Sequence, residues 1–267
     1  MSEAPTILVF DSGLGGLTVF REVAALRPDA RYVYAADDAA FPYGGWTEGE
    51  LSDRVISVMD DLIGRFEPNL IVIACNTAST LVLAELRRRF SLPFVGTVPA
   101  IKPACAASST KLVSVLGTEA TVAREYTKAL IRDFAQSCDV TLVGSGRLAV
   151  LAEAQLHGET VDIEAIAAEI APCFVEKNGV RTDIVVLACT HYPLLLERLR
   201  AASPWPVTFI DPAPAIARRV LELLGPPRDA MRGPSACIHF TSGKEAPGPL
   251  LSAIAGFGFH PIPAGAA

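Results

Sequence analysis

Short apolar segments alternate along the chain with longer stretches in which apolar residues recur every three or four positions. The apolar segments predict strands at residues 6–10, 31–36, 69–74, 111–116, 139–143, 182–187, 206–210 and 236–241. The helical periodicity predicts helices at residues 15–27, 48–65, 78–90, 119–134, 147–157, 160–177, 193–202 and 212–224. Two segments, IVIA and IVVLA, are apolar throughout, which is typical of strands buried on both faces of a parallel sheet. The alternation predicts an α/β fold with mainly parallel sheets.

The chain also repeats itself. The segment NLIVIACNTAST at residues 69–80 resembles TDIVVLACTHYP at 182–193, because each is a buried strand that ends in Ala-Cys and leads into a helix. More loosely, ILVFDSGLGG at 7–16 resembles LVSVLGTEAT at 112–121. We therefore expect two similar α/β domains. The first is formed by residues 1–97 and 208–267, and the second by residues 98–207, so that the tail returns to complete the first domain.

Composition narrows the class of protein. Hydrophobic residues make up 51% and charged residues 19% of the 267 positions, which argues for a folded core and against disorder. The net charge of −6 disfavours general nucleic-acid binding. The mean hydropathy is +0.37, yet no apolar run approaches the roughly 18 residues of a membrane span. The start, MSEAPTILVFDSG, lacks the basic residues of a signal peptide, so we expect a cytoplasmic protein.

Six cysteines lie at positions 75, 105, 138, 173, 189 and 237, with no CxxC pair and no zinc-ligand spacing. Cys75 and Cys189 both follow a buried strand and precede a helix, where backbone amides and the helix dipole favour a thiolate and lower the pKa of a thiol. One cysteine at a strand end is ordinarily packing. Two cysteines at matching positions of two similar halves favour a catalytic role. We expect the other four cysteines to be core or surface residues.

Two thiols on opposite walls of one cleft suit a particular reaction. Disulfide exchange prefers both thiols on one loop, and a cysteine hydrolase needs one nucleophile and a base. Stereoinversion needs one group to remove a proton from one face of a carbon and another to protonate the opposite face. For both transfers at neutral pH, we expect both thiol pKa values within a few units of 7.

Cofactor motifs are incomplete in the sequence. The segment Gly13-Leu14-Gly15-Gly16 has Thr18 where a dinucleotide loop needs glycine, and Gly243-Lys244 has Ile238 at the upstream glycine position of a phosphate loop. None of the five lysines falls at a polar strand end, which argues against pyridoxal phosphate. We expect no cofactor and no metal. The glycines can still bring backbone amides close to a small anion.

Three further polar residues are candidates for a catalytic role, but each also suits an ordinary structural role. Asp11 directly follows the first strand and also suits a turn or helix cap. His191 lies two residues after Cys189 and also suits a cap or the surface. Glu153, within LAVLAEAQL, also suits a solvated helix face.

Five segments occur in the order of one known family: ILVFDSGLGGLTV (7–19), Asp37 followed by FPYG (41–44), IACNTAS (73–79), LGT (116–118) and LACTHYPLL (187–195). On these segments the chain resembles the glutamate racemases of the cofactor-independent aspartate/glutamate racemase superfamily. The resemblance implies two pseudo-symmetric three-layer α/β domains with the active site at their interface. It also implies interconversion of L- and D-glutamate, which supplies D-glutamate for peptidoglycan.

The resemblance assigns roles to individual residues. Cys75 would take the proton from D-glutamate, assisted by Asp11, and Cys189 would take it from L-glutamate, assisted by His191 and Glu153. The substrate contacts that it implies are Asp11, Ser12, Pro42, Tyr43, Gly44, Asn76, Thr77, Thr118, Thr190 and His191. No arginine lies in these motifs, so we expect neutral donors and helix-end amides to hold the substrate carboxylates.

Two alternatives stay open. One is an aspartate racemase or another cysteine-dependent racemase or isomerase of the superfamily, although Thr190-His191 together with DSGLGG favours glutamate. The other is a non-catalytic regulatory protein, which the two intact cysteines argue against. The expected partner is a small-molecule substrate, with no nucleic acid and no membrane; a homodimer is left open.

Overall fold

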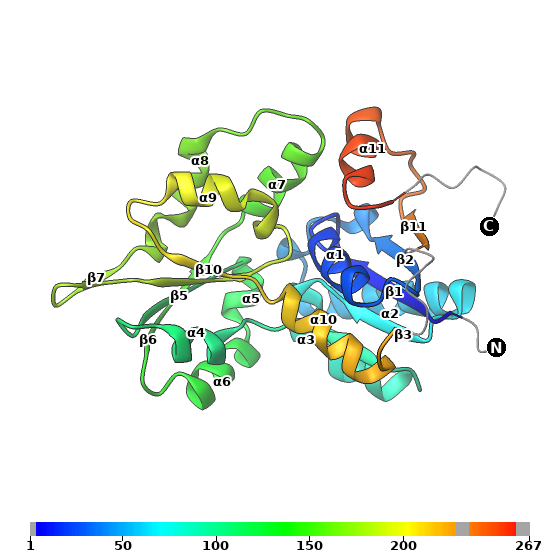
Figure 1. Ribbon diagram of the computed structural model, residues 1–267, viewed down its shortest axis with the longest axis horizontal. Coiled ribbons are helices and arrows are strands. Elements are labelled where there is room, and N and C mark those ends of the chain that lie inside the picture. Colours follow the sequence, from blue (N-terminus) through cyan, green and yellow to red (C-terminus); the bar gives the residue numbers. More distant parts are fainter. Residues whose placement is uncertain (1–3, 228–234, 260–267) are drawn as a thin grey trace.

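A five-stranded parallel sheet forms one half of the computed structural model, which describes residues 4–227 and 235–259 (Figure 1). Its order is β11-β2-β1-β3-β4. The strands are β1 (Thr6–Asp11), β2 (Arg31–Ala36), β3 (Leu70–Ile73), β4 (Phe94–Gly96) and β11 (Ser235–Phe240). Side chains of a strand alternate between faces, so Ile7 and Val9 enter one core and Leu8 and Phe10 the other. The first core contains α1 (Leu17–Leu26), α10 (Ala213–Leu224) and α11 (Gly248–Ala255), and the second contains α2 (Glu48–Phe66) and α3 (Asn76–Arg89).

A second parallel sheet has the order β10-β9-β5-β6. Its strands are β5 (Leu112–Gly117), β6 (Asp139–Gly144), β9 (Ile184–Ala188) and β10 (Thr208–Ile210). One face is covered by α7 (Leu148–Leu156), α8 (Ile163–Ile170) and α9 (Leu196–Ala202), and the other by α4 (Ile101–Ala107) and α6 (Glu125–Phe134). Each sheet is thus the middle of three layers. We call the elements around the five-stranded sheet the first domain and those around the four-stranded sheet the second domain.

The two sheets share one topology. The order β2-β1-β3-β4 in the first corresponds strand by strand to β6-β5-β9-β10 in the second, and β11 is the additional strand. This correspondence pairs β1 with β5 and β3 with β9, the same pairs of segments whose sequences resemble each other. The predicted fold class, two similar α/β domains with parallel sheets, is confirmed.

Several element boundaries differ from the prediction. The helix expected at 119–134 is two helices, α5 (Glu119–Ala123) and α6, because Arg124 between them has an extended backbone. The helix expected at 160–177 ends at Ile170. A 3-10 turn, η3 (Ala171–Cys173), follows with a proline near its start, and the chain then forms the hairpin of β7 (Glu176–Lys177) and β8 (Val180–Arg181). The remaining short helices are η1 (Asp38–Ala40), η2 (Tyr43–Gly45) and η4 (Tyr192–Leu195).

The chain crosses between the domains twice. It leaves the first domain after β4, and it returns to it between β10 and α10. The last strand before this return, β10, pairs with β9 of the second sheet. The full division into 1–97 with 208–267 and 98–207 stays a prediction.

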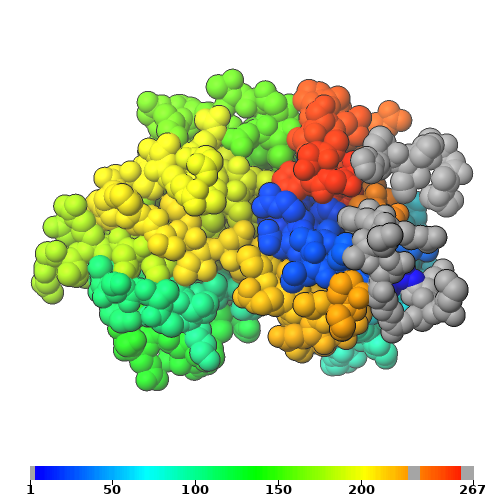
Figure 2. Space-filling model, in the orientation of Figure 1, coloured from blue at the N-terminus to red at the C-terminus, as the bar shows by residue number. Residues whose placement is uncertain are grey.

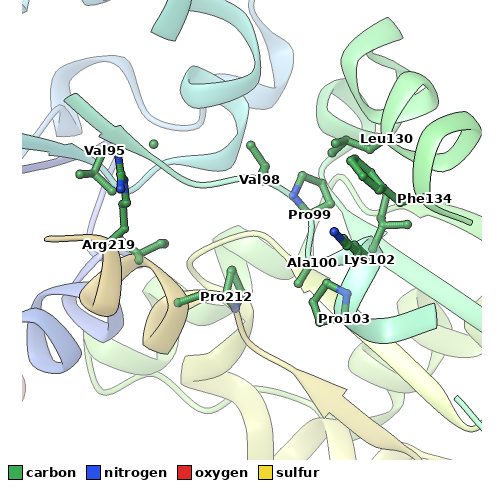
Figure 3. Close-up of a pocket in the computed structure, with 14 residues that line it drawn as sticks. Val95, Val98, Pro99, Ala100, Lys102, Pro103, Leu130, Phe134, Pro212 and Arg219 are labelled. Carbon is green, nitrogen blue, oxygen red and sulfur yellow. The ribbon is translucent and has the colours of Figure 1, made fainter. Parts of the chain in front are cut away.

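Both crossings border a cavity of about 310 Å³ (Figure 3). Pro99 and Ala100 from the first crossing and Pro212 from the second line it, together with Arg219 of α10, and neither Cys75 nor Cys189 does. This cavity therefore lies beside both connections between the domains. Figure 2 shows the surfaces of the two domains in contact, with the second domain against the part of the first domain that is coloured blue. No helix in residues 4–227 and 235–259 has both the length and the apolarity needed to cross a membrane.

Candidate active site

Four strands end at one small cavity between the domains. Ser12 follows β1, Cys75 follows β3, Thr118 follows β5 and Cys189 follows β9, and all four line this cavity. Its other lining residues are Phe41, Pro42, Tyr43, Gly44, Asn76, Thr77, Ala149, Thr190 and His191. Ligands of open parallel sheets bind at the carboxyl ends of the strands, and here the carboxyl ends of both sheets meet.

The cavity is nearly closed. Its volume is about 20 Å³, which is room for roughly one water molecule. An amino acid is larger than this volume, so the cavity must widen before one can bind.

Cys75 is a buried thiol at the start of α3. Its Sγ donates to the Ser12 hydroxyl at 3.7 Å. Burial raises the pKa of the Cys75 thiol to about 12, and the nearby Asp11 carboxylate adds to the rise, while the Ala78 amide and Ser12 oppose it. The expectation of a lowered pKa at this strand end is therefore wrong for the closed structure, because burial outweighs the amides of the helix start. Cys75 is accordingly protonated at rest.

Cys189 is the first member of a chain of three polar groups. Its Sγ lies 3.9 Å from His191 Nδ1, and His191 Nε2 lies 2.8 Å from Glu153 Oε1. Burial lowers the pKa of His191, but the hydrogen bonds and charges of Cys189 and Glu153 outweigh it and raise that pKa well above its ordinary value. Burial alone would raise the pKa of Glu153, but the hydrogen bond and charge of His191 outweigh burial and lower that pKa. These three side chains form a path along which a proton can move to and from Cys189.

The turn after β1 joins the first domain to these second-domain groups. The Leu14 amide donates to Glu153 Oε1 at 2.6 Å, and Thr190 Oγ1 donates to Asp11 Oδ1 at 3.1 Å. The other Asp11 oxygen accepts from the Gly16 amide at 3.1 Å. Burial raises the pKa of Asp11, with His191 opposing. The turn is therefore fixed to both halves of the site.

Asn76 is the clearest sign of a ligand. Its side chain is 2% exposed and lines the cavity, yet neither its Oδ1 nor its Nδ2 has a hydrogen-bond partner. A buried amide with both ends unpartnered is unusual in a folded protein, because each lost hydrogen bond costs about 1–3 kcal/mol. A polar ligand in the cavity would supply both partners.

Hydroxyl groups occupy one wall of the same cavity. Thr77 Oγ1 lies 3.0 Å from Thr118 Oγ1, and Thr118 also accepts from the Thr121 amide at the start of α5. No lysine or arginine lines the described cavity. The wall therefore offers neutral donors and the amide ends of two helices to an anion.

The residues predicted from the sequence fall into two groups. Eleven line the cavity: Ser12, Pro42, Tyr43, Gly44, Cys75, Asn76, Thr77, Thr118, Cys189, Thr190 and His191. Asp11 and Glu153 lie behind it, where they hold Thr190 and His191. Sequence reasoning missed Phe41, whose ring lies 5.3 Å from that of His191, and Ala149. The position of Phe41 directly before Pro42 could have indicated it, whereas Ala149 is a small apolar residue in a helix and gives no such signal.

The described part of the chain holds no group of three or more His, Cys, Asp or Glu side chains arranged to bind a metal ion. Fold and site together define a class: a two-domain α/β protein with a cysteine from each domain facing one shared cavity.

Comparisons with known proteins identify the family. The sequence profile of the Asp/Glu/Hydantoin racemase family matches residues 18–220. A glutamate racemase from Mesorhizobium japonicum is 58% identical over 246 residues, covering 91% of this chain and 94% of its own. The Brucella anthropi glutamate racemase is 58% identical over 223 residues, covering 83% and 80%.

A solved structure agrees with these relatives. The Escherichia coli glutamate racemase, in complex with L-glutamate and the activator UDP-MurNAc-ala, superposes with a TM-score of 0.87 at 41% identity and 96% coverage of both chains. The chain belongs to the Asp/Glu/Hydantoin racemase family, and it is an isomerase of the amino-acid racemase type.

The contact between the β1 turn and His191 predicts the effect of one added methyl group. A Cβ at Gly15 would lie 2.5 Å from His191 Nδ1 and 2.6 Å from the His191 backbone nitrogen. Gly15→Ala must therefore displace the turn or the histidine, and a displacement of about 1 Å lowers kcat/KM about 100-fold. Gly64→Ala is the control, because nothing lies within 4 Å of its Cβ. Equal racemase kinetics for the two variants would contradict the close approach.

The His191–Glu153 pair predicts a pH dependence of stability. The folded state raises the pKa of His191 above its unfolded value of about 6.5, so this stabilisation is complete below that pH and is lost as pH rises through the raised pKa. Glu153, with a lowered pKa, loses its share as pH falls below about 4.3. Between these two pH values, the free energy of unfolding of wild type, measured with denaturant, should therefore exceed that of His191→Asn by about 2 kcal/mol. The difference should shrink on both sides, and a constant difference from pH 4 to 10 would rule the pair out.

Proposed function

We infer that the protein is a glutamate racemase, which interconverts L- and D-glutamate with Cys75 and Cys189 as its two acid/base groups and without a cofactor. The observation that carries this proposal is the meeting of two equivalent strand-end cysteines at one cavity that also holds the unpartnered Asn76 amide. The 58% identical relatives, both glutamate racemases, favour glutamate over aspartate.

The geometry supports a division of labour between the thiols. Removing the Cα proton of an amino acid is difficult, so the site must stabilise negative charge on the substrate with preorganised donors. The hydroxyls of Thr77 and Thr118, the Asn76 amide and the first amides of α3 and α5 would serve that task. They carry no charge of their own.

Protonation states set the direction of each transfer. Cys75, protonated at rest, is ready to deliver a proton to the face from which D-glutamate is made. Cys189 would remove the proton from L-glutamate, and His191 with Glu153 would accept or return the proton of that thiol. Asp11 would act on Cys75 through its charge, which makes the Cys75 thiolate a stronger base in the reverse direction.

The product points to a use in the cell. D-glutamate is a constituent of bacterial peptidoglycan, so we place the enzyme before the synthesis of peptidoglycan precursors. We place it in the cytoplasm, where a reducing environment keeps both thiols free.

Single cysteine substitutions test the proposal. Cys75→Ala and Cys189→Ala should each lower racemisation of glutamate by at least about 100-fold in both directions, because one missing group leaves one face of the carbon unserved. Cys173→Ala is the matched control, since Cys173 is fully buried in the second domain and does not line the cavity. Purified proteins should be assayed with both enantiomers of glutamate and aspartate by chiral chromatography. Near wild-type turnover by either active-site variant, or faster turnover of aspartate, would refute the proposal.

A further inference from the structure

A buried carboxylate outside the cavity ties three separate segments of the first domain together. Asp37, at the end of β2, is fully buried. Its Oδ1 accepts from Arg54 at 2.5 Å and from Thr241 at 2.6 Å, and its Oδ2 accepts from Tyr43 at 2.5 Å and from Arg54 at 3.1 Å. Arg54 lies on α2, Tyr43 on η2, and Thr241 directly after β11.

One of these partners belongs to the wall of the active site. Tyr43 is 1% exposed, and its neighbours Pro42 and Gly44 line the cavity with it. Among the described hydrogen bonds, the Tyr43 phenol makes one, to Asp37. The position of this wall therefore depends on where Asp37 is held.

The other partners fix Asp37 itself. Arg54 binds it with two nitrogens, a geometry that sets orientation as well as distance. The segment after β11 adds a second attachment, because Ser242 donates its amide to the adjacent Asp38 at 2.9 Å. The C-terminal part of the first domain is thereby linked to the cavity wall.

We propose that Asp37, held by Arg54 and Thr241, is a positioning group that sets the Pro42–Gly44 wall against the substrate. The inference rests on the proposed function, because it assigns this wall to substrate binding. None of the three groups touches the cavity, so they act through Tyr43 and perform no proton transfer. Losing them should weaken substrate binding for both enantiomers alike.

A merely stabilising role is the alternative, and the chain offers a comparison. Arg27 is likewise bound by two nitrogens to a carboxylate, that of Asp29 at 2.8 Å; it is more buried than Arg54 and does not line the cavity. Removing either arginine should lower Tm, but only loss of Arg54 should change KM.

Kinetics of Tyr43→Phe, Arg54→Met and Arg27→Met distinguish the two roles. Loss of one charge-assisted hydrogen bond in the Asp37 group should raise KM about tenfold for both L- and D-glutamate. The kcat should change less, and the ratio of solvent-deuterium exchange to inversion should stay at the wild-type value, since no proton carrier is altered. Arg27→Met should keep the wild-type KM. Arg54→Lys, which keeps the charge but not the two-nitrogen geometry, should recover part of the loss.

The pH profile provides a second readout. Burial raises the pKa of Asp37, but Arg54, Thr241 and Tyr43 outweigh it and keep that pKa below its usual range. The charged or titratable groups that act on Asp37 and Arg54 are each other, Tyr43 and Asp38, and the Tyr43 phenol is also acted on by Cys75 and Asp11. Without Arg54 the carboxylate binds a proton at higher pH, so the acid limb of kcat/KM should move to higher pH in Arg54→Met and not in Arg27→Met.

The outcomes separate this inference from the proposed function. If wild type does not racemise glutamate, the proposed function fails. If wild type is active and the Asp37-group variants keep the wild-type KM and acid limb while losing Tm, the positioning role is wrong.

Discussion

The contact between the β1–α1 turn and the polar groups beside Cys189 is the interaction on which the cavity between the domains depends. Leu14 donates to Glu153, Asp11 accepts from Thr190, and Gly15 leaves no room for a side chain beside His191. Through these contacts the first domain orders the groups around Cys189, although Cys189 belongs to the second. The two cysteines thus line one cavity that contacts between the domains hold together.

Burial also determines which groups of the site are charged. The two carboxylates Asp11 and Glu153 and the His191 imidazole are all buried near the interface, and burial opposes charge on each of them. Of the three groups, only the His191 imidazole becomes positively charged when it binds a proton. Its hydrogen bond to Glu153 therefore favours the charged forms of both partners. Burial, by contrast, raises the pKa of Asp11. The duplicated fold therefore carries two unlike half-sites: a protonated thiol with a carboxylate behind it, and a thiol with a histidine beside it.

Much of this arrangement could be predicted from the sequence because it is local. The fully apolar strands β3 and β9 and the Ala-Cys at their ends predicted the fold class and the position of both thiols. What could not be predicted depends on packing between distant segments. The pKa of Cys75 follows from its burial and from the nearby Asp11, and the attachment of Thr241 to Asp37 joins residues more than 200 positions apart. The short strand β4 and the helices α4 and α11 had too little periodicity to be recognised.

The central claim is that two different thiols serve the two faces of one carbon. A thiol carries a single proton, so a proton removed from one face stays on that cysteine while a solvent-derived proton arrives from the other. In D₂O, wild type acting on one enantiomer should therefore place deuterium at Cα of the product, while substrate recovered early keeps its hydrogen. Mass spectrometry after chiral separation should show this from either enantiomer. Early deuterium in the recovered substrate at the same rate as in the product would indicate a single shared base and would contradict the account.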